Sequence, residues 1–163
     1  MVDSPFLKPK STHDTIESSF LLLRIYVPNS LGATVSVTGE NNQQKISVLI
    51  VDDEPDLRDI YAYKLEIEGY KVCTADGGHE AIEMLKKEDN GIDLVLTDLM
   101  MPKGNGIELA EFSLNLNVPI LIASAYIDSF KGKIPEGAMI LRKPFNLDEL
   151  TICIQKAVKK NET

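Results

Sequence analysis

The sequence lacks the features that mark membrane, disulfide-rich or nucleic-acid-binding proteins. None of its 163 residues belong to an apolar run of membrane-spanning length, so we expect a soluble protein with no membrane insertion. It has just two cysteines, Cys73 and Cys153, in apolar segments without ligand-like spacing, which we interpret as buried thiols in a reducing, cytoplasmic compartment. A formal charge of -8 and a pI near 4.8 leave no basic footprint, so we predict no direct binding to nucleic acid.

Residues 1–44 differ in composition from the rest of the chain, because they are rich in Ser, Thr, Asn and Gly. We interpret them as a poorly ordered N-terminal extension that ends in a polar linker at residues 39–44. A misassigned start site would explain the same composition. One apolar run, at residues 20–27, could form a short helix or strand. Arg24 interrupts this run and acidic residues precede it, a pattern that does not fit a signal peptide.

From residue 45 onward, short apolar runs alternate with segments of helical periodicity. Strands are predicted at residues 46–51, 70–75, 93–98, 118–124 and 139–142. Helical spacing is found at residues 55–68, 78–85, 107–114 and 147–158. This alternation predicts an α/β fold with a doubly wound, five-stranded parallel sheet over residues 45–160, followed by a tail at 161–163.

Two details of the helices can also be predicted. The first helix should start at Pro55, stop at Gly69 and place Leu57, Ile60, Tyr61 and Leu65 at helical spacing. Between the fourth and fifth strands, Gly132 and Pro135 leave room for only a short helix.

Polar side chains stand where the predicted strands end. Asp52 and Asp53 follow the first strand, Asp98 ends the third run, Ser124 ends the fourth strand and Lys143 follows the fifth. Because parallel strands end at the same edge of a sheet, these five side chains should converge there.

Three carboxylates, a hydroxyl and an ammonium form a site for phosphoryl chemistry. Carboxylate oxygens without His or thiolate nearby suit Mg²⁺, and a divalent ion with an ammonium keeps the crowded acids ionised. Asp98 stands alone and is the candidate nucleophile, while Asp52 and Asp53 are candidate metal ligands. Lys143 would hold Asp98 and then a phosphoryl oxygen, to which Ser124 would also donate.

These motifs together resemble the receiver domain of two-component response regulators, of the single-domain type found in chemotaxis. The resemblance covers about residues 45–160, and the segments that carry it are Val48-Leu-Ile-Val-Asp-Asp-Glu-Pro55, Asp98-Leu-Met-Met-Pro102 with Gly106, Pro119-Ile-Leu-Ile-Ala-Ser-Ala125 and Lys143-Pro-Phe145. It implies a flavodoxin-like sheet of order 2-1-3-4-5.

The resemblance also implies roles for individual residues. Asp53 would be a direct Mg²⁺ ligand, assisted by Asp52, and the backbone carbonyl of Met100 would complete the metal shell. Asp98 would accept phosphate from a histidine kinase or a phosphotransfer protein. Phosphorylation would then change binding to a downstream protein whose identity the residues do not indicate.

The sequence departs from the family pattern in three places. Ile140 occupies a position that is often aromatic and moves with the serine or threonine during switching, so Tyr126 is the candidate substitute. The segment between Ser124 and Lys143 is short, which predicts a short or irregular fourth helix and puts the usual output face in question. Asn105 replaces a frequent acidic residue, a change to which we attach little weight.

Three functions are compatible with these residues. The first is a signalling module, which catalyses only its own phosphorylation and dephosphorylation and is not otherwise an enzyme. Because the chain ends at Thr163, we expect it to act alone or as a phosphorelay intermediate. The second is a Mg²⁺-dependent phosphatase with an aspartyl phosphate intermediate. The third is a pseudo-receiver that docks to partners without phosphorylation, an alternative that Ile140 keeps open.

Overall fold

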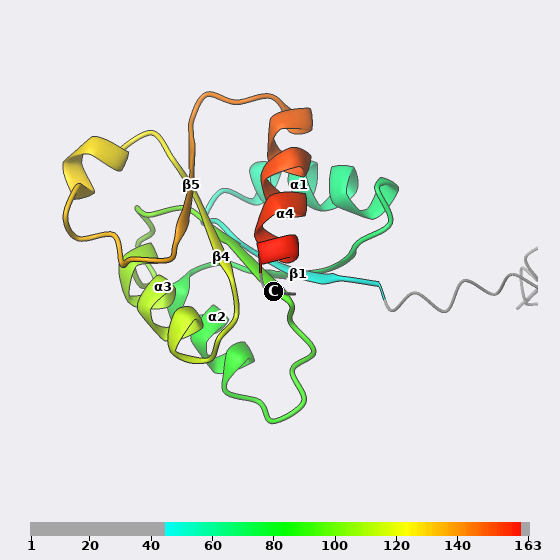
Figure 1. The fold of residues 1–163 in the computed structure, drawn as a ribbon, viewed down its shortest axis with the longest axis horizontal. Helices are drawn as coiled ribbons and strands as arrows, with labels where there is room; N and C mark the ends of the chain where they lie inside the picture. The colour runs from blue at the N-terminus through cyan, green and yellow to red at the C-terminus, as the bar shows by residue number, and fades with distance from the viewer. Residues whose placement is uncertain (1–44, 161–163) are drawn as a thin grey trace, which may run out of the picture. The chain divides into compact units, whose positions relative to one another are not determined.

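Five parallel strands form one sheet in this computed structural model, which describes residues 45–160 (Figure 1). The strands are β1 (Ser47–Val51), β2 (Lys71–Ala75), β3 (Leu94–Thr97), β4 (Ile120–Ser124) and β5 (Met139–Arg142). They lie in the order β2-β1-β3-β4-β5, and every neighbouring pair is parallel. The predicted flavodoxin-like order is therefore confirmed. The predictions for residues 1–44 and 161–163 lie outside the described residues.

Two helices cover each face of the sheet. On one face lie α1 (Pro55–Ile67) and α4 (Leu147–Lys160), and on the other lie α2 (Gly78–Leu85) and α3 (Gly106–Asn115) (Figure 1). Successive residues of β1 alternate between the two cores: Val48 and Ile50 face α1 and α4, whereas Leu49 and Val51 face the other pair. Because both faces are covered, the central strands can be apolar throughout, as their sequences are.

Local sequence explains where the helices begin and end. Pro55 occupies the first turn of α1, where its missing N–H costs nothing, and Gly69 ends the segment with a φ of 93° that few other residues adopt. The amide of Glu149 donates to Asn146 Oδ1, and Glu149 Oε2 accepts from the Asn146 amide, so the two side chains form a reciprocal capping pair at the start of α4.

The connection from β4 to β5 contains one short 3₁₀ turn, η1 (Ile127–Phe130), in place of a full helix. The predicted short fourth helix is thus confirmed. Arg142 on β5 makes a two-pronged ion pair with Asp128 in this turn, at 2.8 and 3.0 Å. Because so short a turn covers little of β5, Ile140 remains 46% exposed.

Residues that share the helical spacing of α1 differ in burial, and the expected burial of the two cysteines was wrong. Ile60 is 48% exposed, because Tyr61 and Leu65, four residues apart, form the inward face of α1 and Ile60 points away from it. Cys73 and Cys153 are half-buried rather than buried. Cys73 belongs to β2, which is an edge strand and has a neighbour on one side only.

Candidate functional site

The strands deliver the predicted site residues to one edge of the sheet, which we call the carboxyl edge because all five strands end there. Val51 pairs with Thr97 in the register of β1 and β3, so Asp52 and Asp98 leave adjacent strand ends. Ser124 is the last residue of β4, and its carbonyl accepts a hydrogen bond from the amide of Lys143 at 3.1 Å. The expected convergence of these groups is what the fold produces.

Lys143 joins two of the acids. Its Nζ lies 2.7 Å from Asp98 Oδ2 and 3.3 Å from Asp52 Oδ2, and 19% of its side chain is exposed. Burial alone would lower the pKa of the ammonium, but the hydrogen bond to Asp98 and the charges of both acids raise it above its usual value. Lys143 therefore remains charged at neutral pH and offsets two carboxylates at once.

Asp98 is held in its ionised form. Its Oδ1 accepts hydrogen bonds from the amides of Leu99 and Met100, and its Oδ2 accepts from Lys143. Burial raises the pKa of the Asp98 carboxyl, but the hydrogen bond and charge of Lys143, with smaller contributions from Ser124 and the Met100 amide, lower it below its ordinary value. An ionised, oriented and partly desolvated carboxylate is suited to nucleophilic attack.

Asp52 and Asp53 are adjacent in the sequence but differ in their surroundings. Asp52 is 4% exposed, and its Oδ1 accepts from the amide of Glu54 at 2.9 Å. Asp53 is exposed, and its carboxylate makes no hydrogen bond or ion pair within residues 45–160. Asp53 therefore offers carboxylate oxygens that no hydrogen bond or ion pair of the described residues occupies.

Ser124 and Met100 complete the predicted set. The Ser124 side chain is fully buried, and its Oγ accepts from the amide of Tyr126 at 3.3 Å. Met100 donates its amide to Asp98, while its side chain is 54% exposed. The structure thus brings every predicted site residue to the carboxyl edge.

The donor set matches a hard cation. Within residues 45–160, no three His, Cys, Asp or Glu side chains converge closely enough to hold a metal by themselves. Mg²⁺ does not need three, because it keeps several waters and takes one or two carboxylates. The free carboxylate of Asp53 beside the buried Asp52 fits that requirement, whereas Zn²⁺ would seek nitrogen or sulfur ligands.

Sequence reasoning missed two supports of the site. Arg58 donates from Nη1 to the backbone carbonyl of Asp52 at 2.6 Å, which ties α1 to the end of β1. Tyr61 stacks on Phe145 with ring centroids 5.8 Å apart, so α1 also packs on the segment that follows Lys143. The spacing of Arg58, six residues after Asp52 and near the start of a helix, was a usable signal; the aromatic pair spans too much sequence to be recognised.

A tight backbone contact sets the loop after β3. A side chain at Gly106 would collide with the carbonyl of Asp98 and would lie 2.9 Å from Leu99 Cα. The Gly106 amide donates to the Leu99 carbonyl at 3.1 Å. Glycine at this position therefore lets the loop turn back on itself and fixes the strand end that carries Asp98.

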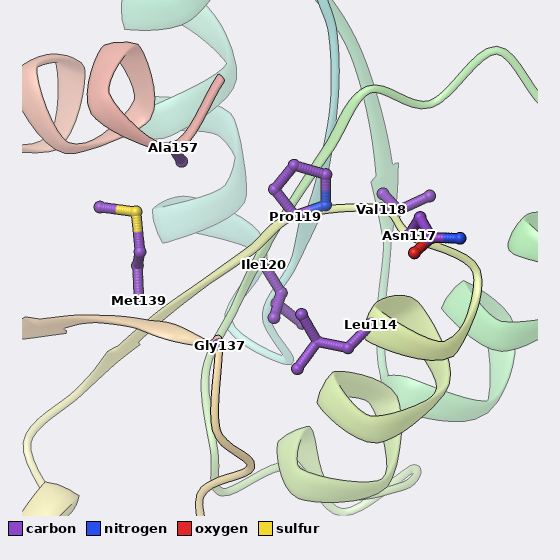
Figure 2. A pocket seen from close by; sticks show the side chains of 8 residues that line it. All are labelled: Leu114, Asn117, Val118, Pro119, Ile120, Gly137, Met139 and Ala157. Carbon is purple, nitrogen blue, oxygen red and sulfur yellow. The ribbon is translucent and has the colours of Figure 1, made fainter. Parts of the chain in front are cut away.

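A separate pocket of about 220 Å³ lies at the opposite edge of the sheet, where β4 and β5 begin (Figure 2). Its walls include Leu114 of α3, Pro119 before β4, Met139 of β5 and Ala157 of α4. No titratable side chain lines it. We therefore assign the functional site to the carboxyl edge.

Comparisons with known proteins indicate one family. A family model described as the response regulator receiver domain matches residues 48–155. A transcriptional regulatory protein CpxR homolog from Haemophilus influenzae is 38% identical over 118 residues, which is 70% of this chain and 51% of that protein. The CpxR protein of Escherichia coli K12 is 34% identical, with 70% and 50% covered. The chain spans about half the length of these curated relatives.

Solved structures give the same match. A response regulator receiver domain from Clostridium thermocellum has a TM-score of 0.64 and 30% identity, covering 72% of this chain and 97% of the other. The chemotaxis protein CheY4 of Vibrio cholerae has a TM-score of 0.58 and 27% identity, covering 69% and 98%. In residues 45–160, no helix is both long and apolar enough to span a bilayer.

Proposed function

The chain belongs to the response regulator receiver family, and on that premise we propose that Asp98 is the phosphoacceptor of a two-component or phosphorelay system. Receivers are signalling modules rather than enzymes in the usual sense. The observation that carries the proposal is the contact of Lys143 Nζ with both Asp98 and Asp52, which leaves a charged carboxylate beside its counter-charge at the carboxyl edge. The donor would be a histidine kinase or a phosphotransfer protein.

The residues of the site have distinct tasks in this reaction. An oxygen of Asp98 attacks phosphorus, and the bond between phosphorus and the donor's imidazole nitrogen breaks with its electron pair returning to that nitrogen. Lys143, already 2.7 Å from Asp98, then stabilises a phosphoryl oxygen that carries negative charge. The Ser124 hydroxyl donates a hydrogen bond to another phosphoryl oxygen. Later, water attacks phosphorus, the bond from phosphorus to the Asp98 oxygen breaks, and inorganic phosphate leaves as the carboxylate is restored.

Asp53 and Asp52, with Asp98 and the backbone carbonyl of Met100, would hold Mg²⁺. When bound, the ion neutralises charge on the oxygens of the transferring phosphoryl group. Asp53 is suited to direct contact because it is exposed and makes no ion pair among the described residues. Asp52 already accepts from Glu54 and Lys143, so it suits an assisting role.

Switching would use the Ser124 side of the site. Since Ile140 carries no aromatic ring and is 46% exposed, we assign the surface change to η1 and its link to β5, with Tyr126 as the candidate substitute for the aromatic group. We further propose that residues 1–44 form an N-terminal extension and residues 45–160 form the receiver domain. The protein would act in the cytoplasm on an unidentified downstream protein. Unpaired Cys73 and Cys153 support a reducing compartment.

The two alternatives are not favoured. Aspartyl-phosphate phosphatases of doubly wound fold place their nucleophile after the first strand with a second acid two residues later, whereas here the first-strand acids are adjacent and Asp98 follows β3. A pseudo-receiver would not need an ionised Asp98 paired with Lys143.

The test is the intact mass of the protein after incubation with acetyl phosphate and Mg²⁺. We expect one added phosphoryl group on the wild type and on Asp89→Asn, a control at an exposed carboxylate, but none on Asp98→Asn. If the wild type gains no phosphoryl group at any Mg²⁺ concentration, the proposal is wrong and the domain is a docking module.

A further inference from the structure

A pocket of about 430 Å³ opens at the carboxyl edge beside Asp53. Its walls are mostly apolar, and they include Leu99, Met100, Met101, Pro102 and Phe130. Pockets that bind small ligands have volumes of about 300–1,000 Å³ and are lined by apolar groups with a few polar ones. This pocket therefore has the size and lining for an apolar group of the dimensions of an aromatic ring.

Phe130 reaches this pocket because of the short connection between β4 and β5. It is the last residue of η1, it is half-buried, and it packs against the core under α2 and α3. The opposite wall is the loop after β3. Two segments that are distant in the sequence thus enclose the space next to Asp53, and η1 supplies its one aromatic wall among the lining residues.

Two residues of the pocket wall also hold the proposed phosphoacceptor. Leu99 and Met100, which line it, donate their amides to Asp98 Oδ1. Lys143 contacts the other oxygen of the same carboxylate and does not line the pocket. In phosphoryl transfer the leaving group stands in line with and opposite to the attacking oxygen, so it departs on the side away from Asp98.

We propose that this pocket binds the apolar body of the phosphodonor's leaving group, which makes Phe130 a specificity-determining residue for phosphoryl transfer to Asp98. The inference rests on the proposed function. Its occupant is the part of the donor next to the transferred phosphoryl group. A donor with an apolar leaving group buries surface against Phe130 and the methionines as it reacts, whereas a small polar donor leaves the pocket to water.

Two acyl phosphates provide matched probes, since they share the reacting group and differ only in the size of the apolar body. In both, an Asp98 oxygen forms a bond to phosphorus, the bond from phosphorus to the acyl oxygen breaks, and the electron pair leaves with acetate or benzoate. The measurement is the ratio of second-order phosphorylation rates for benzoyl phosphate and acetyl phosphate, followed by intact mass with Mg²⁺ present.

For the wild type we expect this ratio to exceed one by about tenfold, because a few apolar atoms in a hydrophobic pocket give discrimination of about 10–200-fold. Phe130→Ala should bring the ratio close to one. Phe112→Ala is the matched control, as Phe112 is also half-buried against the same core but does not line the pocket, and it should retain the wild-type ratio.

The outcomes separate this inference from the proposed function. Reaction with both donors at equal rates in the wild type would overturn the inference and leave Asp98 as the phosphoacceptor. A ratio that falls equally in Phe130→Ala and Phe112→Ala would also overturn it, because general loosening of the core would then explain the effect. No reaction with either donor would contradict the proposed function itself.

Discussion

The two edges of the same sheet differ in charge and in polarity. At the carboxyl edge, Lys143 Nζ lies 2.7 Å from Asp98 Oδ2 and 3.3 Å from Asp52 Oδ2. Asp52 and Ser124 are almost fully buried there. At the amino edge, where β4 and β5 begin, the space between helices and strands is an apolar pocket. Burying charge is costly unless it is paired, so the carboxyl edge keeps a network that the core alone would not require.

The difference follows from strand direction. Because β1, β3, β4 and β5 are parallel, residues at equivalent positions near their ends meet, although they are far apart in the sequence. The amino edge receives chain that enters from helices α2, α3 and η1, and its contacts are those of ordinary packing. Substitutions at the two edges should therefore separate function from stability.

The largest effect is expected for Lys143→Met at the carboxyl edge. Loss of the ammonium removes the counter-charge of Asp98 and Asp52, and removing one preorganised charge-stabilising donor typically slows a reaction by about 10²–10³-fold. The rate of phosphorylation by acetyl phosphate measures this. Lys156→Met, at an exposed position of α4, is the control and should react at the wild-type rate. Equal rates in both variants would contradict the assigned role of Lys143.

Gly106→Ala should lower both the stability of the fold and the rate of phosphorylation. The new methyl group would meet the backbone at Asp98 and Leu99, and overpacking of this kind costs about 1–3 kcal/mol. Urea unfolding should show that loss, and phosphorylation should slow because the strand end moves. Unchanged stability together with a wild-type rate would contradict the close contact of Gly106 with the backbone of Asp98 and Leu99.

Leu114→Ala tests the amino edge. The side chain is half-buried at the wall of the apolar pocket, so its truncation should cost roughly 1–2 kcal/mol of unfolding free energy. Phosphorylation of Asp98 should proceed at the wild-type rate when the variant is folded. If the folded variant reacted more slowly than the wild type, substitutions at the two edges would not separate function from stability.

The smallest effect is expected from pH. The pKa of Asp98 is lowered in the folded protein, so its ionised form stabilises the fold fully above the ordinary carboxyl pKa of about 3.9. That contribution is lost as the pH falls through the lower, folded-state pKa. In metal-free buffer, acidification below about pH 4 should therefore narrow the stability difference between wild type and Asp98→Asn, as measured by urea unfolding. A constant difference would argue against the pairing with Lys143.

Much of the fold could be predicted because the sequence repeats a simple signal. Apolar runs such as Leu94–Thr97 alternate with helical segments, and polar residues at run ends indicate which edge becomes the site. Proline and glycine fixed the ends of α1 for local reasons that need no tertiary contacts. The strand order itself came from the family resemblance, since alternation alone does not determine it.

The remaining features depend on contacts that periodicity does not encode. Ile60 has the spacing of a buried residue, but the position of α4 against α1 decides that Tyr61 and Leu65 face inward. The stacking of Tyr61 on Phe145 joins segments more than eighty residues apart. The pocket beside Asp53 depends on where η1 places Phe130. The short segment between Ser124 and Lys143 predicted an irregular turn but not the position of this side chain.

The most direct test of Asp98 as the phosphoacceptor is the chemical location of the phosphoryl group. Borohydride reduces an acyl phosphate to an alcohol and so converts a phosphorylated aspartate to homoserine, which peptide mass spectrometry locates. After reaction with acetyl phosphate and Mg²⁺, we predict homoserine at position 98 and unmodified aspartate at positions 52 and 53. Homoserine at position 52 or 53, or at none of the three, would contradict it.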